Sequence, residues 1–340
     1  MTATMPTGTT TPAASAARSR SWRPSRRLVP TLATFVLFVA LFAGGSLRYD
    51  GFFSGQVLLN LFVDNAFLIV LAVGMTFVIL TGGIDLSVGS VVALSGVLSA
   101  KLLAAGWAPV PVMLLVLVLG TALGLAMGAV IHYLDVQPFV VTLAGMFLAR
   151  GLCYVVSVES IPIRDPLFTA FATGAVYLPG TELYVSPSVL VALAVVAIAA
   201  YVLACTRFGR GVYAVGGSSH SAMLMGLPVA RIRVGVYAIS GFCSALGGLL
   251  FAFYALSGYS LAAVGTELDA IAATVIGGTL LSGGVGLVAG SLLGVLVLGL
   301  IQTVISFEGT LSSWWTKIVI GVLLLAFVVL QRVIVRGGPR

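Results

Sequence analysis

The feature that most constrains the fold is a series of long apolar stretches that carry almost no charge. Ten such stretches occupy most of the 340 residues, and glycine, proline or polar residues separate them. Only 8% of the chain is charged and 60% is hydrophobic, a balance far from that of a soluble domain. Because a helix needs about 20 apolar residues to cross a bilayer, the sequence predicts an all-α integral membrane protein, a polytopic bundle of about ten transmembrane helices.

The predicted spans follow one another with short connections in most places. They are residues 28–46, 58–80, 86–103, 110–131, 139–156, 189–205, 234–256, 268–281, 287–305 and 318–335. The stretch 268–281 is short for a crossing, so it is either a half-helix or part of a longer span. A total of nine or eleven spans stays open, and broken helices are expected within the bundle.

Basic residues indicate the topology. Of the 17 Lys and Arg residues, five arginines lie in residues 1–27, four in residues 206–233 and three near the C-terminus. Ten spans place these groups on one side of the membrane, which the positive-inside rule identifies as the cytoplasmic side. We therefore expect both termini and the segment 206–233 to be cytoplasmic, and the long loop 157–188 to lie outside.

The first 27 residues differ from the rest in composition. They are rich in Thr, Ala, Ser and Pro and then in arginine, which predicts a disordered basic tail ahead of a membrane domain at residues 28–336. A signal peptide is the alternative. It is disfavoured because the apolar stretch 28–46 is long for a cleaved signal and lacks a clear small-x-small cleavage motif.

A helix break interrupts the apolar sequence at Gly82 and Gly83. Glycine permits backbone conformations that are closed to other residues, and Asp85 can cap a helix beginning at Leu86 by accepting from an amide such as that of Ser87. In a soluble protein this would be an ordinary turn. Between two membrane helices, a break has to be buried in protein, line a cavity or lie at an interface.

Ionisable side chains inside the spans are candidates for a polar pathway, because each is costly in lipid. The sequence offers Asp64, Arg150, Asp85, Glu267 and Asp269. Interhelical pairing and capping are the alternative, and for Asp85 a cap is the better interpretation. The residues assigned to the helix break and a possible pathway are Gly82, Gly83, Asp85, Ser87, Gly89, Asp64 and Asn65.

A second glycine segment resembles the first. Residues 81–90 (TGGIDLSVGS) align with residues 282–291 (SGGVGLVAGS), and five of the ten positions are identical. Chance similarity is a fair alternative, because glycine and serine are common in this chain. A true repeat would indicate two related halves around a pathway, as in many transporters.

Several functional classes are excluded by missing motifs. Neither Lys101 nor Lys317 completes the Gly-Lys-Ser/Thr of a phosphate-binding loop, so the chain is not a P-loop ATPase. The isolated His132 and His220 and the three dispersed cysteines provide no metal-binding spacing. No catalytic constellation and no nucleic-acid module is visible. A transporter is therefore favoured over a membrane enzyme, and a stand-alone secondary carrier remains an alternative.

The motif GMTFVILTGGIDLSVGSVVALSG resembles the signature of sugar permeases of the ribose/galactose class, the membrane subunits of binding-protein-dependent ABC importers. The segment TRFGRGVYAVGGSSHSAMLMG resembles their cytoplasmic coupling segment. The resemblance covers about residues 30–335. Within the class, NLFVDNAFLIVLAVGMTF, PFVVTLAGMFLARGLCYVVSVESIPI, GTELDAIAATVIGGTLLSGGVG and GTLSSWWTKIVIGVLL are similar to the galactofuranose permease subgroup.

The resemblance implies an import subunit of the bacterial cytoplasmic (inner) membrane that works with other chains. These would be a cytoplasmic ATP-binding subunit that binds ATP-Mg, a periplasmic or lipid-anchored sugar-binding protein, and a second copy of this permease or a related one. The chain itself would bind no cofactor and contact only membrane lipid and these partners. The residues expected to couple to the ATPase lie in the coupling segment, residues 206–233: Gly216, Gly217, Ser218, Ser219, Ala222, Leu224, Gly226 and Pro228. Ser218 departs from the asparagine that is usual in the family, although serine can make similar backbone hydrogen bonds.

Overall fold

The computed structural model of the chain describes residues 29–177, 179–310, 312 and 314–336. The predicted tail, residues 1–27, lies outside them. Within the described residues the chain forms thirteen α-helices and four two-residue strands. The helices are α1 (Val29–Arg48), α2 (Gly55–Leu80), α3 (Val88–Ala104), α4 (Pro109–Tyr133), α5 (Pro138–Val156), α6 (Pro166–Thr173), α7 (Pro187–Cys205), α8 (Arg207–Gly217), α9 (Ser219–Leu224), α10 (Val229–Ala255), α11 (Thr266–Ile276), α12 (Val288–Glu308) and α13 (Trp314–Arg336). The strands are β1 (Ile161–Pro162), β2 (Val176–Tyr177), β3 (Tyr184–Val185) and β4 (Ser257–Gly258).

Each of the ten predicted spans corresponds to a helix of the bundle, which confirms the all-α membrane fold. Seven described helices are long and apolar enough to cross a bilayer, namely α1, α2, α4, α5, α7, α10 and α12. The apolar parts of α3 and α13 are shorter. Helix α11 has only 11 residues, about 17 Å at 1.5 Å per residue, so it reaches about halfway through a bilayer core of about 30 Å.

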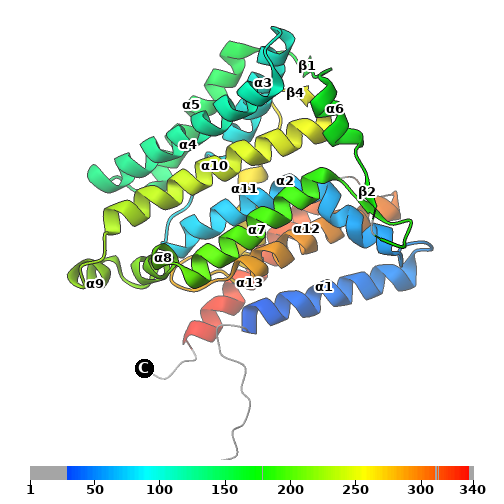
Figure 1. Cartoon of the computed structure of the whole chain (residues 1–340). Helices are drawn as coiled ribbons and strands as arrows, with labels where there is room; N and C mark the ends of the chain where they lie inside the picture. Colours follow the sequence, from blue (N-terminus) through cyan, green and yellow to red (C-terminus); the bar gives the residue numbers. More distant parts are fainter. Residues whose placement is uncertain (1–28, 178, 311, 313, 337–340) are drawn as a thin grey trace, which may run out of the picture.

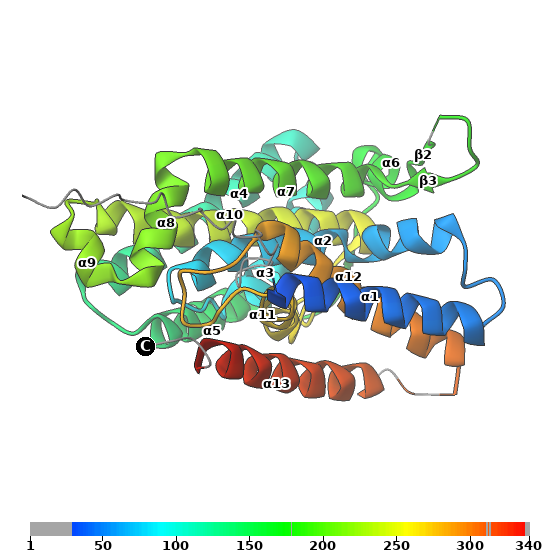
Figure 2. The same cartoon turned by 90° about the horizontal axis from the view of Figure 1, so that it is seen from below.

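Helices α2 and α10 lie at the centre of the bundle (Figure 1). Helix α2 packs against α7, α10, α11 and α12, while α10 also contacts α3 and α4. Seen from below, α7 and α13 lie on opposite sides with α2, α11 and α12 between them (Figure 2). The contact between α4 and α10 is very close, because Gly120 and Gly124 lie directly against the backbone of Tyr237 and Gly241. Glycines spaced by four residues allow such an approach.

The two ends of the bundle carry different structures. At one end, β1 pairs with β4 and β2 pairs with β3, and α6 packs against α10. Over its described residues, the long loop 157–188 therefore contains several short elements. At the opposite end lie α8 and α9, toward which the start of α1 and the end of α13 also point (Figures 1 and 2). Both ends of the described chain thus share the side of the coupling segment, as an even number of crossings requires.

Helical structure is interrupted at two places beside the short helices α3 and α11. After α2 ends at Leu80, the chain runs without helical structure to Ser87, and α3 begins at Val88, two residues later than the sequence predicts. The predicted span 268–281 is wrong at its C-terminal end, because α11 stops at Ile276 and a loop of turns follows. Glycines with positive φ cause this stop, at Gly278 (φ 99°) and Gly283 (φ 85°), since an L side chain rarely adopts that conformation.

Candidate functional site

A wide cavity of about 630 Å³ opens at the end of the bundle that lies opposite α8 and α9. The first half of α2, the end of α10, the first turn of α11 and the last half of α12 form its walls. Its polar lining residues are Asn60, Asp64, Asn65, Thr266, Asp269, Gln302, Thr303 and Ser306, and its aromatic ones are Phe67, Tyr254 and Phe307. The cavity therefore offers many hydrogen-bonding groups beside a few apolar ring surfaces.

Asp64 and Asn65, which the sequence suggested for a pathway, both line this cavity. They lie about 14 Å along α2 from its first residue, at 1.5 Å per residue. Asn65 is buried, and its Nδ2 donates to the Leu61 carbonyl at 2.9 Å. Asp64 is exposed to the cavity, and its Oδ1 accepts from the Tyr254 hydroxyl of α10 at 3.5 Å. The adjacent pair thus presents a carboxylate and a carboxamide to a solute.

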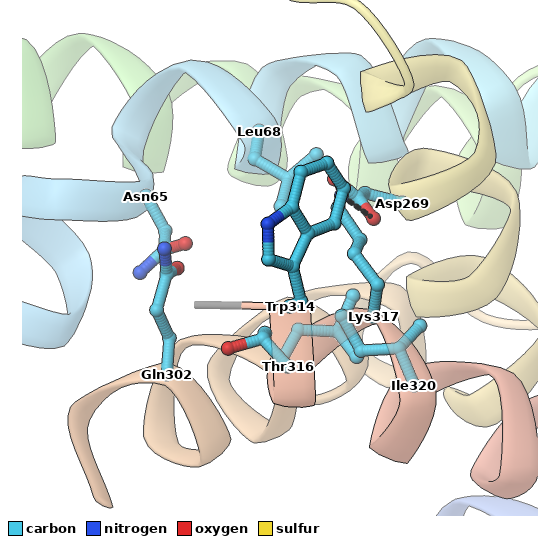
Figure 3. A pocket seen from close by; sticks show the side chains of 9 residues that line it. Asn65, Leu68, Asp269, Gln302, Trp314, Thr316, Lys317 and Ile320 are labelled. Atoms are coloured by element: carbon cyan, nitrogen blue, oxygen red, sulfur yellow. Dashed lines mark hydrogen bonds and ion pairs between the residues drawn. The ribbon is translucent and has the colours of Figure 1, made fainter. Parts of the chain in front are cut away.

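A side pocket of about 210 Å³ adjoins the wide cavity and shares Asn65, Leu68, Asp269 and Gln302 with it. Its further wall comes from the first turns of α13, which add Trp314, Thr316, Lys317 and Ile320 (Figure 3). Lys317 Nζ donates to both carboxylate oxygens of Asp269, at 2.6 and 2.8 Å, and so links α13 to α11. This ion pair leaves the pocket polar but locally neutral.

The other half of the bundle is closed. Every residue of α2 from Leu68 to Leu80 is buried, over about 18 Å of helix. Thr76 Oγ1 donates to Ser291 Oγ of α12 at 2.7 Å within this packed region. Packed side chains therefore surround α2 between the wide cavity and the α8–α9 end.

The predicted helix break contains Gly82 with φ 79°, a conformation that favours glycine. Asp85 is fully buried beyond it, but it is not the N-cap, because Ser87 occupies the residue before α3. The Asp85 Oδ1 accepts from the Ser87 amide at 2.9 Å and from its hydroxyl at 2.6 Å. Its Oδ2 accepts from Ser240 Oγ of α10 at 2.7 Å. The interpretation of Asp85 as a helix cap is therefore incomplete, because its carboxylate also joins the helix break to α10 through a hydrogen bond.

The N-termini of the two short helices α3 and α11 meet inside the bundle. Gly89 in the first turn of α3 lies against Glu267 in the first turn of α11, and a Cβ at position 89 would overlap the Glu267 carboxylate and come within 2.9 Å of Thr266 Oγ1. Helix N-termini carry partial positive charge, and a nearby carboxylate is stabilised there. Gly89 thus has a steric role at this contact, and Thr266 joins it to the wall of the wide cavity.

Three glycine segments that are far apart in sequence meet in one place, which we call the glycine junction: residues 80–83, 216–217 and 283–284. The Gly284 amide donates to the Leu80 carbonyl at 2.9 Å, so the second glycine segment is bonded to the residue that precedes the first. Gly216, near the end of α8, packs so closely that a Cβ there would overlap the Leu80 carbonyl and lie 2.5 Å from the Gly284 nitrogen. The coupling segment therefore contacts both helix breaks directly.

Helix α8 is attached to the bundle and α9 extends away from it. Tyr213 of α8 donates to the Gly286 carbonyl at 2.9 Å. Ser218 ends α8 and begins α9, and its Oγ accepts from the Ser221 amide at 3.2 Å, so serine makes the backbone bond expected at this position. Ser219 is the first residue of α9, and Ala222 is its one buried residue.

The exit from α9 is a compact glycine turn. Gly226 has φ 75°, its amide donates to the Met223 carbonyl at 2.9 Å, and the Leu227 amide donates to the Ala222 carbonyl at 3.1 Å. This pair of bonds is the Schellman motif, which ends a helix with a left-handed residue. Pro228 then precedes α10. Within the coupling segment, α9 itself therefore covers only Ser219–Leu224.

Three residues of the polar space were not predicted from the sequence, namely Gln302, Trp314 and Lys317, and neither was the pairing of Asp269 with Lys317. Gln302, Thr303 and Ser306 are polar residues at i, i+1 and i+4 in an otherwise apolar span, so they share one helix face. That pattern was available in the sequence. The pairing of Lys317 with Asp269 was not, because 48 residues separate them.

The comparisons with known proteins agree that the chain is similar to transport permeases. Residues 57–328 match the family described as the permease component of the branched-chain amino acid transport system. The inner membrane ABC transporter permease protein YjfF of Escherichia coli (strain K12) is 50% identical over 308 residues, 90% of this chain and 93% of that protein. The fructose import permease protein FruG of Bifidobacterium longum is 39% identical over 95% of this chain and 96% of its own length. The ribose import permease protein RbsC of Haemophilus influenzae is 38% identical over 84% and 88%. No solved structure matches.

Proposed function

The chain belongs to this family of ABC importer permeases, together with sugar import permeases, and we propose that it carries a furanose sugar such as galactofuranose through the wide cavity. As a permease subunit of the inner membrane it is a transport protein and not an enzyme. The proposal concerns the finer points: the sugar, the pathway, the partners and the orientation, with both termini in the cytoplasm.

The wide cavity is the observation that carries the proposal. Its volume of about 630 Å³ lies within the range of about 300–1,000 Å³ that is usual for small-molecule sites. Its lining combines carboxamides, hydroxyls and carboxylates with aromatic rings. Hydroxyl groups of a sugar both donate and accept hydrogen bonds, as do Asn and Gln side chains. The lining therefore suits a neutral polyol.

The charge of the lining favours a sugar over an amino acid. A zwitterionic amino acid needs a free cation for its carboxylate, because an unpaired charge in a desolvated space is costly. Among the described residues that line the two spaces, Lys317 is the only basic one, and it is already paired with Asp269 at 2.6 Å. The branched-chain amino acid in the family description is for this reason a poor fit to this chain.

Three of the four segments that resemble the galactofuranose subgroup supply part of the cavity walls. Asp64 and Asn65 come from NLFVDNAFLIVLAVGMTF, Asp269 from GTELDAIAATVIGGTLLSGGVG, and Trp314 and Lys317 from GTLSSWWTKIVIGVLL. These stretches are distant in sequence and converge on the polar space. Their convergence supports a substrate of that subgroup, a furanose with its exocyclic hydroxyls.

The driving force in this proposal comes from a separate subunit that hydrolyses ATP-Mg and docks on α9. Met223, Leu224 and Met225 are exposed there at 59%, 74% and 69%, although they are large and apolar. A sugar-binding protein would deliver the substrate at the opposite end, where the wide cavity opens. A second permease, identical or related, would complete the assembly. The glycine junction would transmit a movement of α8 and α9 to both helix breaks.

Uptake by living cells tests the substrate. In a strain without other uptake routes for the sugar, deletion of the gene is expected to abolish uptake of labelled galactofuranose. Uptake in the parent strain should resist competition by ribose, xylose and galactopyranose. Unchanged galactofuranose uptake after deletion would overturn the assignment of the sugar, and strong competition by ribose would reassign the substrate.

A further inference from the structure

We propose that the side pocket is a sugar-selective subsite of the permease itself, in which the carboxamides of Gln302 and Asn65 bind hydroxyl groups and Trp314 covers a face of the sugar ring. This inference rests on the proposed function, and it assigns discrimination between monosaccharides to these residues. It places part of the selectivity in the membrane subunit, in addition to any selectivity of a delivering protein.

The side pocket is continuous with the proposed pathway. It shares Asn65, Leu68, Asp269 and Gln302 with the wide cavity, so a solute in the wide cavity faces it directly. Its volume is about 210 Å³, one third of that of the wide cavity. The wide cavity can admit solutes of many shapes, whereas the narrower side pocket brings polar groups to a solute from α2, α11, α12 and α13 at once. Discrimination between similar solutes requires such convergence.

Two carboxamides in the pocket retain hydrogen-bonding capacity. Gln302 is exposed, and its side chain makes no hydrogen bond to any described residue. Asn65 uses one N–H on the Leu61 carbonyl, at 2.9 Å, which leaves its Oδ1 and its second N–H. Both groups lie on the same side of the pocket (Figure 3). Each carboxamide can accept from one sugar hydroxyl and donate to its neighbour, which suits a vicinal diol.

Trp314 faces these carboxamides across the pocket, with the N–H edge of its indole turned toward them (Figure 3). The side chain is 75% exposed, which is a large uncovered aromatic area at the start of α13. The C–H groups on one face of a sugar ring are apolar and pack on an aromatic surface, while the indole N–H bonds a hydroxyl. Polar groups on one wall and an aromatic ring on the other match a monosaccharide, which has both hydroxyl groups and an apolar face of C–H groups.

The ion pair makes the subsite selective for neutral solutes. Lys317 neutralises Asp269 through both of its carboxylate oxygens, so neither charge is free to attract an ionic ligand. The Asp269 side chain is only 17% exposed, and its remaining lone pairs can accept from a sugar hydroxyl. A phosphorylated or carboxylated sugar would have to break this pair or leave its own charge unmatched.

Equilibrium binding to the purified permease–ATPase complex, without a sugar-binding protein, tests the subsite. Labelled galactofuranose is the probe, and ribose and galactopyranose are competitors. Gln302→Leu removes the carboxamide from an exposed position, where folding should tolerate it. Trp314→Leu removes the ring, and Trp314→Phe keeps a ring. Trp315→Leu is the matched control, because Trp315 is the next residue of α13, is 47% exposed and lines neither space.

We expect about tenfold weaker binding for Gln302→Leu and Trp314→Leu, as the loss of one net hydrogen bond or ring contact implies. Trp314→Phe should recover most of the affinity, and Trp315→Leu should bind within about twofold of the wild type. The preference for galactofuranose over ribose should fall in the two leucine variants. Equal affinity and an unchanged competitor ranking in all variants would overturn the subsite.

The same preparation separates this inference from the proposed function. If the wild-type complex reconstituted with its binding protein transports no sugar with ATP, the proposed function fails. If it transports sugar while the side-pocket variants keep the wild-type affinity and ranking, only the subsite fails. An anionic sugar that binds as tightly as galactofuranose would contradict the role of the Lys317–Asp269 pair.

Discussion

At Gly216 the structure leaves no room for a side chain. An alanine Cβ would overlap the Leu80 carbonyl and press on the Gly284 nitrogen at 2.5 Å, and both neighbours are backbone atoms that cannot rotate away. Overpacking of this kind costs about 1–3 kcal/mol. We predict that Gly216→Ala lowers sugar uptake by about tenfold or more while the ATPase of the complex continues to turn over.

The adjacent glycine provides the control for that prediction. A Cβ at Gly217 would meet nothing within 4 Å, so Gly217→Ala should retain uptake close to that of the wild type. The measurement is the ratio of sugar imported to ATP hydrolysed in reconstituted complexes. Equal ratios for the two alanine variants would show that the glycine junction does not transmit movement.

Asp85 yields a second prediction at the scale of a residue. Asp85→Leu removes the acceptor of two buried hydroxyls and one amide, which should destabilise the protein by on the order of 2–4 kcal/mol. Asp85→Asn keeps one oxygen acceptor and adds a donor for Ser240 Oγ, so its effect should be near 1 kcal/mol. Thermal unfolding of the purified variants checks the order. If Asn and Leu abolish uptake equally in folded protein, the charge itself is required.

At the scale of elements, the positions of the helices could be predicted from the sequence. The residues at which helices end, and the contacts between distant segments, could be predicted far less well. The lengths of the apolar stretches alone located the ten spans, because a helix needs about 20 apolar residues to cross the bilayer core. The end of α11 at Ile276 was not predictable from hydropathy, since the apolar run continues to Leu281 and only the positive-φ glycines stop the helix. The meeting of Gly82, Gly216 and Gly283 depends on tertiary packing between segments that are distant in sequence, and the similarity of residues 81–90 and 282–291 pointed only to two of the three.

Helix α9 carries a prediction as an element. Leu224→Glu places a charge on an exposed apolar side chain that the proposed ATPase contact would bury. We expect the affinity for the ATP-binding subunit to fall by about tenfold or more, as for a central interface residue. The control is Leu134→Glu after α4, where the leucine is 69% exposed, compared with 74% for Leu224. Co-purification of the two subunits measures the effect, and equal recovery with both variants would remove α9 from the interface.

Substitutions at Gly226 test whether the turn after α9 is needed to position that helix. A Cβ there has open space around it, so any effect of substitution comes from its φ of 75° and not from a clash. Gly226→Val should strain the turn by about 1–2 kcal/mol and misplace α9, because a β-branched residue is disfavoured at positive φ. Gly226→Asn should be milder, since asparagine tolerates this region. Sugar-stimulated ATPase activity that is normal in Gly226→Val would contradict the importance of the turn.

At the scale of the whole molecule, the wide cavity and α9 lie at opposite ends of the bundle, with the buried half of α2 and the glycine junction between them. The sequence suggested one wall of the cavity, through Asp64 and Asn65, and the coupling segment. It did not indicate the wall made by Gln302, Trp314 and Lys317, because polar residues on different helices reveal a common cavity only after the helices are packed. This arrangement predicts a transporter whose opening at one end is controlled from the other.

Import by reconstituted vesicles tests the central claim most directly. Purified permease, ATP-binding subunit and sugar-binding protein are placed in proteoliposomes, and labelled galactofuranose is followed with ATP, with a non-hydrolysable ATP analogue, and without the ATP-binding subunit. We predict sugar accumulation only with ATP and all components. Accumulation that persists without the ATP-binding subunit or without ATP would contradict the account and identify a carrier that works alone.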